Sequence, residues 1–498
     1  MKIFSTIIKK YLPSVLSIVL AFAMIFLVVS IIKSVYYYQY DSDEFYHVQR
    51  AYLIATGFKP YTSFFFYFSS IFHRVLVLPL LFFGFSFATL GKLRLFMVLL
   101  FTVRVILSFL LINKVFNRRI AILFIPLLLI DPFTIFSSMQ IRPDNLMMIF
   151  YTLGLLIFVK GFLKSSKLLT FIAGIILGLS IITLLKIAPQ LATFFVMYGI
   201  YCILNRQLNF FVLLLDGFVL TLFLFGVYHL LNGSFISMFE QVFIFPFTIP
   251  KLITNQVNYG FFHQSNNGFI YGLMGKPIIW AYEWILPLLA ASGAYLKLKN
   301  IDNKKQLIQT IFVASLVVQY LFLLKLDTVF IQYYIPFQWL LALFAAVLLE
   351  DFIFNKFSAG FFHQLIKGGS FVLLILLVYV SVQANNARAE FKSEPQLSQF
   401  APVWSKIPQN AAIFPSILFR PIAYPLSVYD DQLNYFDTFA SVKNTFPKHI
   451  DSFQKNKLPY MVIDDPIKFY ALEPGLDRYV KDHYQKIDNQ INLYKRVK

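Results

Sequence analysis

The sequence predicts a polytopic α-helical membrane protein that ends in a small α/β domain. Hydrophobic residues make up 58% of the 498 residues and charged residues only 13%, about half the share that is typical of soluble domains. The apolar residues form runs of about 20, the length that an α-helix needs to cross a bilayer. Polar, charged and proline residues return after about Gln383, which indicates a change to a soluble segment.

The charge of the chain fits the same class. The formal net charge is +19, and the basic residues cluster between apolar runs, as the positive-inside rule predicts for the cytoplasmic loops of membrane proteins. Nucleic-acid binding is the alternative, but the basic residues are not gathered on one face, so no nucleic-acid partner is expected. The single cysteine, Cys202, lies in an apolar run and excludes a disulfide scaffold.

The first apolar run follows the basic residues Lys2, Lys9 and Lys10 and extends over about 12–34. It is too long for a signal peptide, and no small-residue cleavage site follows it. We interpret it as an uncleaved first transmembrane helix with a cytoplasmic N-terminus.

The run at 71–88 decides the topology of everything after it. If it spanned, the basic clusters near 114–119, 160–167 and 297–305 would all lie outside, against the positive-inside rule. We therefore interpret 71–88 as a juxtamembrane or re-entrant segment, which leaves 11 spanning helices. After 12–34 these are the runs near 93–112, 120–137, 145–160, 168–185, 188–204, 208–231, 278–296, 307–324, 331–349 and 368–384.

This topology places every candidate catalytic carboxylate on the non-cytoplasmic side, together with a first outer loop at 35–92. We expect a transmembrane catalytic domain over 1–384 and an extracytoplasmic α/β domain over 385–498. In that domain we predict strands at 411–415, 459–464 and 492–497 and helices at 441–457 and 476–486.

The acids that could carry chemistry follow the first span directly. Asp41, Asp43 and Glu44 lie there, and Asp43 and His47 would share one face of a helix. They could act as a general base with its hydrogen-bond network, or hold a divalent metal ion near Asp43 through oxygen and imidazole ligands. The structural alternative is a helix start capped by Ser42 or Asp43. Both readings stay open.

A second polar cluster is Arg142–Pro143–Asp144, between two apolar runs. It could face the same cavity as Asp43, or form a capped helix start with a neighbouring ion pair. Lys186, at the outer end of a run, is placed to meet a phosphate or to snorkel. Arg104 lies inside a run, where it could pair with an acid or bind an anion. Weaker candidates for a polar site are His73, Arg74, His263, Gln332, Tyr333 and Tyr334.

Several motifs of soluble enzymes are absent. The chain has no P-loop, GxGxxG, HExxH or GxSxG motif, which argues against a nucleotide-driven pump and against a donor bound in a Rossmann domain. A membrane enzyme of this kind needs a donor that arrives through the lipid.

The residues of the first outer loop resemble those of the GT-C glycosyltransferases. The sequence is most similar to the protein O-mannosyltransferase and aminoarabinose-transferase branch, in the acid pair followed by a basic residue and Gly-x-x-Pro-Tyr. The resemblance covers about residues 12–345, although the acid that relatives often place after Pro–Tyr is missing at 62–65. The matching residues are Asp43, Glu44, Arg50, Gly57, Pro60, Tyr61, Arg142, Asp144, Lys186, Tyr334 and Pro336.

The resemblance implies an inverting transfer of one sugar from a polyprenyl-phosphate donor to a lipid, glycan or protein acceptor at the outer face of a bilayer, expected to be a bacterial inner membrane. It makes Asp43 the general base and lets Glu44 and Asp144 orient the substrates, while Arg74, Arg142 and Lys186 stabilise the departing phosphate. The other candidate substrate-binding residues are His47, Arg50, Tyr61, His73, His263, Tyr333 and Tyr334.

A second class of function fits part of the pattern. A flippase or transporter of lipid-linked sugars would use the same donor without chemistry, but transporters often carry internal repeats and the sequence shows none. No cofactor is predicted with certainty beyond the metal alternative near Asp43.

Overall fold

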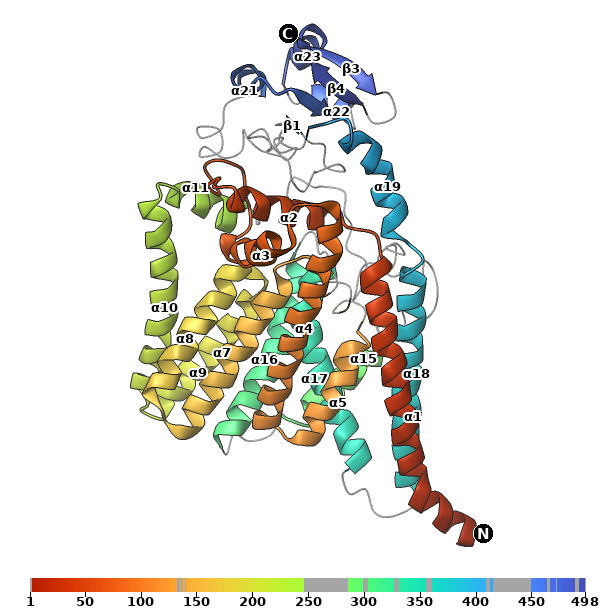
Figure 1. Cartoon of the computed structure of the whole chain (residues 1–498). Coiled ribbons are helices and arrows are strands. Elements are labelled where there is room, and N and C mark those ends of the chain that lie inside the picture. The colour runs from red at the N-terminus through yellow and green to blue at the C-terminus, as the bar shows by residue number, and fades with distance from the viewer. Residues whose placement is uncertain are drawn as a thin grey trace.

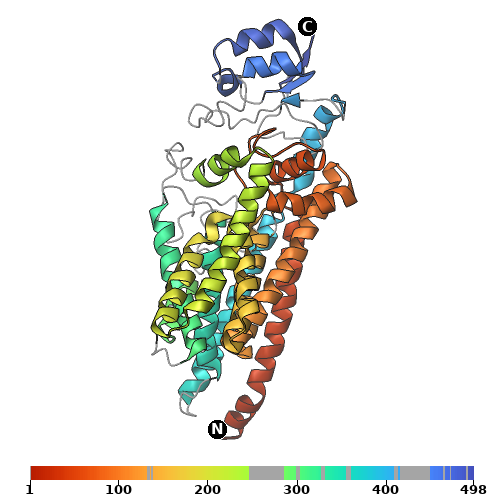
Figure 2. The same ribbon diagram turned by 90° about the vertical axis from the view of Figure 1, so that its left-hand side faces the viewer.

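The computed structural model shows a bundle of long helices with a small sheet beyond one end (Figures 1 and 2). It describes residues 2–131, 135, 138, 140–245, 285–298, 303–326, 331–354, 361–408, 413–414, 449–463, 466–471, 473–488 and 492–497. The helices of the bundle are α1 (Lys2–Tyr37), α4 (Phe87–Val115), α5 (Arg118–Leu129), α7 (Asp144–Lys164), α8 (Lys167–Thr183), α9 (Ala188–Leu204), α10 (Leu208–Leu231), α15 (Leu286–Tyr295), α16 (Lys304–Lys325), α17 (Ile335–Phe354) and α18 (Phe361–Arg388).

These helices confirm the predicted class of an integral, multi-pass membrane protein. Within the described residues, eight helices are long and apolar enough to cross a bilayer. Each of the 11 predicted spans overlaps a bundle helix, and the three that are not among these eight are α5, α8 and α15, which have 12, 17 and 10 residues. The helix α9 is among the eight because it continues a short 3-10 turn that begins at Leu185. The start of the predicted run at 278–296 lies outside the described residues.

Short capped turns make the sequential helices antiparallel neighbours. Asn117 accepts a hydrogen bond from the Ile120 backbone at the start of α5, and Asn303 forms a capping box with Gln306 at the start of α16. Lys164 ends α7, so it lies at the opposite end of that helix from Asp144.

The helices of the bundle pack closely against one another. The helix α17 is the most enclosed span, with 83% of its apolar window buried, and the Trp339 indole donates to Ser108 Oγ of α4 at 2.9 Å. Where α8 crosses α10, Gly174 and Gly217 each face a backbone carbonyl of the other helix, so a Cβ at either position would overlap it. Small residues at such a crossing let two helix backbones approach closely.

The first outer loop forms two helices that lie across the end of the bundle, α2 (Ser42–Ala55) and α3 (Ser70–Phe83) (Figure 1). The 14-residue α3 covers most of the run at 71–88 and is too short to span. It ends at Gly84, whose positive φ of 83° suits a residue without a Cβ. The prediction of a juxtamembrane segment here is confirmed.

The C-terminal residues form a four-stranded sheet in the order β1 (Ile413–Phe414), β2 (Tyr460–Val462), β4 (Leu493–Arg496), β3 (Tyr484–Asp488). Only β1 and β2 pair in parallel. The strands near 411–415, 459–464 and 492–497 were predicted, and α21 (His449–Asn456) lies within the helix predicted at 441–457. The helix predicted at 476–486 is wrong at its end, because α23 (Leu476–His483) stops and β3 begins at Tyr484 to pair with β4.

The chain after α18 is tied to the chain after α1. Gln396 of α19 (Ser393–Trp404) receives the Tyr40 N–H at 2.7 Å and donates to the Tyr40 carbonyl at 2.8 Å. The Gln39 N–H donates to the carbonyl of Phe391 at 2.7 Å. These bonds hold the start of the acid-rich segment against α19 and the turn before it.

Candidate functional site

The acid-rich segment begins α2 with a reciprocal cap. Asp41 is the N-cap residue and accepts the Asp43 N–H at 2.9 Å, and the Glu44 carboxylate accepts the Asp41 N–H at 3.0 Å. This capping box satisfies donors that the first helical turn leaves open. The predicted cap at Ser42 or Asp43 is therefore wrong by one or two residues, and the Asp43 side chain is free of the capping role.

Glu44 lies beneath Asp43 in a buried ion pair that the sequence did not reveal. Arg94 of α4 donates to both Glu44 carboxylate oxygens, at 2.9 Å and 2.6 Å, and neither side chain is more than 1% exposed. The same guanidinium donates to the carbonyls of Val35, Tyr38 and Gln39, where α1 ends. Arg94 thus joins the end of α1 to the start of α2. Arg94 is a charged residue within an apolar run, and this feature of the sequence could have identified it as a residue with a buried partner.

Asp43 is the partly exposed acid of the site. Its side chain is 37% exposed, and its Oδ2 accepts a hydrogen bond of 2.5 Å from Arg142 Nη2. The guanidinium is also 3.7 Å from Asp41 and donates to Gln140, which in turn donates to Asp41. Both predicted clusters therefore meet in one network.

The charges of this network depend on burial. Burial lowers the pKa of Arg142, but the carboxylates of Asp43, Asp41 and Asp144 together raise it above its ordinary value, so the guanidinium stays charged. Burial raises the pKa of Asp41 against the lowering effect of Arg142. Arg142 is only 6% exposed, so it is a fixed cation beside the accessible Asp43.

A second ion pair extends the network towards the bundle. Lys186 Nζ is 2.8 Å from Asp144 Oδ1 and lies 4.9 Å from the centre of the Tyr333 ring. It also donates to the carbonyl of Gln332 at 3.4 Å. The second carboxylate oxygen of Asp144 is buried and accepts no hydrogen bond from the described residues. Asp43, Arg142, Asp144, Lys186 and Tyr333, which we call the acid–base cluster, are thus brought together from four segments.

Other predicted residues lie around α2 but not in the acid–base cluster. His47 is fully buried and shares a hydrogen bond of 2.9 Å with His73 of α3, so its ring packs against α3 and not into the acid–base cluster. Arg50 is 1% exposed and lies over the rings of Tyr46 and Phe64. Tyr61 belongs to the same aromatic core. Burial raises its pKa above the ordinary value.

The remaining candidates are separate. Arg74 lies beyond the other end of α2, where it contacts Tyr228 of α10. Tyr334 is 3% exposed in the bundle core. Arg104 is fully buried and reaches Asn145, at the start of α7, over 3.4 Å. His263 lies outside the described residues.

The donor set near Asp43 does not suit a metal ion. Among the described residues, no three His, Cys, Asp or Glu side chains lie close enough together to hold one. Glu44 forms an ion pair with Arg94, and His47 is hydrogen-bonded to His73. The Arg142 guanidinium lies between Asp41 and Asp43, in the position that a metal ion would need.

The comparisons with solved structures concern the fold. The structure matches ArnT from Cupriavidus metallidurans bound to undecaprenyl phosphate with a TM-score of 0.61 at 14% identity, over 96% of this chain and 97% of ArnT. It matches the Archaeoglobus fulgidus oligosaccharyltransferase in complex with Zn and sulfate with a TM-score of 0.51 at 12% identity, over 95% of this chain and 73% of that one. No protein-family model and no curated protein matches the sequence. The chain therefore shares its fold with these two solved proteins, and this fold agrees with the one that its first outer loop predicted.

Proposed function

We propose that this protein is an inverting glycosyltransferase that moves one sugar from a polyprenyl-phosphate donor to a lipid, glycan or protein acceptor at the outer face of the membrane. The single observation that carries the proposal is the acid–base cluster. It places one accessible carboxylate, Asp43, beside two nearly buried cations, Arg142 and Lys186, at one end of a membrane bundle. The undecaprenyl phosphate bound by ArnT, which shares the fold, supports a lipid-linked donor.

In this proposal Asp43 acts as the general base. It takes the proton of an acceptor hydroxyl as that oxygen bonds to the anomeric carbon of the sugar, while the bond from that carbon to the donor phosphate breaks and its electron pair leaves with the phosphate. A positioned base contributes about 10²–10⁴ to such a rate. The hydrogen bond of 2.5 Å from Arg142 orients the carboxylate for this transfer.

Lys186 is the cation best placed to stabilise the charge of the departing phosphate. It is 10% exposed, and its only ion pair among the described residues is with Asp144. A fixed positive charge where negative charge develops lowers the barrier more in a site with little water than in bulk solvent. Asp144 would then position Lys186, and Glu44 would position α2 through Arg94.

A flippase for lipid-linked sugars is the second candidate, because it would need the same membrane bundle and the same donor site. It has no use for an accessible base beside two cations. The two functions therefore differ in whether Asp43 is required for a covalent product.

The test uses a strain that lacks the gene and compares envelope lipids and glycans by mass spectrometry. The strain receives the wild type, Asp43→Asn, or Asp477→Asn as a control that makes the same change at an exposed acid of the C-terminal domain, 52% exposed. Membrane levels of the three proteins are matched first. We expect a species one sugar heavier with the wild type and Asp477→Asn, and none with Asp43→Asn.

If all three proteins restore the species equally, Asp43 is not the base and the transferase proposal fails. If only the distribution of a lipid-linked sugar between the two leaflets changes, the flippase is the correct class. The mass difference would also identify the class of sugar, whether hexose or pentose.

A further inference from the structure

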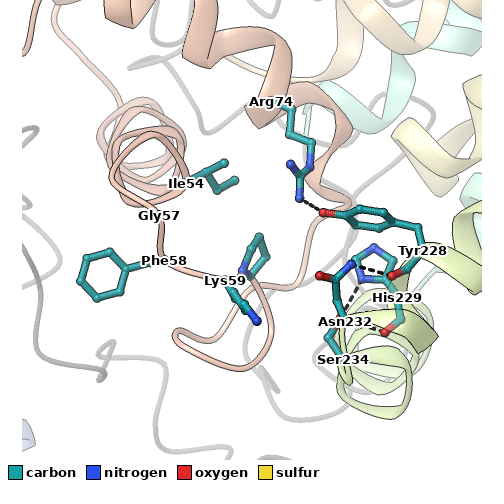
Figure 3. Close-up of a pocket in the computed structure, with 10 residues that line it drawn as sticks. Ile54, Gly57, Phe58, Lys59, Arg74, Tyr228, His229, Asn232 and Ser234 are labelled. Atoms are coloured by element: carbon teal, nitrogen blue, oxygen red, sulfur yellow. Dashed lines mark hydrogen bonds between the residues drawn. The ribbon is translucent and has the colours of Figure 1, made fainter.

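A pocket lies near the far end of α2, away from the acid–base cluster. Its volume is about 230 Å³, and its walls are the loop after α2, Arg74 of α3, the end of α10 and the turn into α11 (Phe235–Phe239) (Figure 3). Asp43 and Ile54, which lines the pocket, are 11 residues apart on α2, a rise of about 16 Å. The pocket is therefore a separate site.

The charged side chains that line this pocket are both basic. They are Lys59 and Arg74, and neither forms an ion pair with a carboxylate in the described part of the chain. Arg74 Nη2 donates to the Tyr228 hydroxyl at 2.6 Å, and its guanidinium lies 5.2 Å from the centre of that ring (Figure 3). This bond holds the Arg74 guanidinium in one orientation and leaves its Nη1 available. A guanidinium fixed in this way is suited to donate hydrogen bonds to phosphate oxygens.

The other described residues of the lining include polar groups and no carboxylate. Asn232 and Ser234 lie on the turn into α11, and His229 shares a hydrogen bond of 2.9 Å with Ser234 Oγ. His229 and Ser234 are 2% and 4% exposed, so they form a fixed floor rather than a mobile surface. A pocket that combines the two cations with these polar groups favours the binding of an anion with several oxygen atoms.

The helices beside the pocket favour a lipid as the source of such an anion. On α3, Arg74 shares a face with Leu78, Leu81 and Phe82, which are 69%, 59% and 83% exposed and follow it at intervals of four, seven and eight residues. On α10, Tyr228 shares a face with Leu231, which is 82% exposed. In a membrane protein such exposed apolar faces contact acyl chains, and basic residues at their ends meet the headgroups.

We propose that this pocket binds the phosphate headgroup of an anionic membrane lipid. Arg74 and Lys59 contact the phosphate oxygens, and the acyl chains lie along the apolar faces of α3 and α10. The proposal is independent of the sugar-transfer chemistry, because its residues are distinct from the acid–base cluster.

The test measures lipid retention on the full-length protein by native mass spectrometry, with dioleoyl phosphatidic acid as the probe and dioleoyl phosphatidylcholine as the zwitterionic comparison. The double variant Lys59→Gln/Arg74→Gln removes both cations. Lys92→Gln is the matched control, because Lys92 is an exposed residue near the outer end of α4 and outside the pocket. We expect the double variant to bind phosphatidic acid at least about tenfold more weakly, since each surface cation near a lipid phosphate contributes about 1 kcal/mol, and Lys92→Gln to stay within twofold of the wild type.

Tyr228→Phe keeps both charges and removes only the bond that orients Arg74, so it tests the site without a change of charge. We expect it to weaken phosphatidic acid binding about threefold. Equal loss in Lys92→Gln and the double variant would overturn the proposal, because binding would then follow overall charge. So would equal retention of phosphatidylcholine, or displacement of the lipid by millimolar inorganic phosphate, which would make the ligand a soluble anion.

Discussion

Asp43 and Arg142 are 99 residues apart in the sequence, yet their side chains share a hydrogen bond of 2.5 Å at the end of the bundle that α2 and α3 cover. The distance from Arg142 Nη2 to Asp41 Oδ1 is longer, at 3.7 Å. The two adjacent acids therefore have different tasks: Asp41 caps α2, and Asp43 is held by a fixed cation with part of its surface open.

The first prediction separates these two acids. Asp43→Asn should lower the rate of sugar transfer by about 10²–10⁴ because it removes the base. Asp41→Asn should change it little, since asparagine caps a helix as well as aspartate does. The rates are measured with purified protein in liposomes that contain the donor lipid identified by mass spectrometry. Equal losses in the two variants would contradict the assignment of Asp43.

The second prediction concerns Lys186, the cation that forms an ion pair with Asp144. Lys186→Met should lower kcat by about 10²–10³, the loss seen when one group that stabilises transition-state charge is removed. Lys186→Arg should recover part of the rate, because it keeps the charge that Asp144 positions at 2.8 Å. If Lys186→Met changes KM alone, Lys186 binds the donor without stabilising the leaving group.

The third prediction tests the buried pair beneath Asp43. Arg94→Met should destabilise the protein by about 3–5 kcal/mol, because it leaves the Glu44 carboxylate buried without its partner. Adding Glu44→Gln should recover part of this loss, since glutamine still completes the capping box. Thermal unfolding in detergent provides the double-mutant cycle. Additive losses would show that the two side chains are not coupled.

The fourth prediction follows from the histidine pair. Burial lowers the pKa of His73 from 6.5 to about 3, so between these values the unfolded chain binds more protons than the folded one. Stability should therefore fall as pH decreases below 6.5, by up to about 1.4 kcal/mol per pH unit. His73→Gln should flatten this dependence in thermal unfolding measured from pH 7 to pH 4. An unchanged slope would assign the dependence to other groups.

The fifth prediction concerns the crossing of α8 and α10. Gly217→Ala should lower the unfolding temperature clearly, because its Cβ would overlap the Phe171 carbonyl oxygen and force the helices apart. Gly368→Ala on α18 is the control, since a Cβ there meets nothing within 4 Å. A similar change in both variants would mean that helix propensity, and not packing, determines the effect.

Much of this architecture could be read from the sequence because the bilayer imposes it. Span length and the distribution of Lys and Arg are local signals, and they were sufficient to identify the runs and to exclude 71–88 from spanning. The fold also explains why Asp43, Arg142 and Lys186 lie together: each follows or precedes a span at the same end of the bundle.

The remaining features depend on contacts between distant segments. The spacing of Asp43 and His47 suggested that both belong to one site. The packing of α2 on α3 instead places His47 in a hydrogen bond with His73. Arg74 was grouped with the phosphate residues, but the length of α2 separates it from Asp43. The first three residues of β3, 484–486, were expected to continue the preceding helix, but their pairing with β4 overrode the local preference.

The bonds between Tyr40 and Gln396 join residues that are 356 positions apart. During synthesis the ribosome must therefore complete the last membrane helix before the segment that carries Asp43 receives its final support. The growing chain inserts its spans while the acids are still without this brace. The acid–base cluster therefore gains this support only after the chain has been synthesised beyond Gln396.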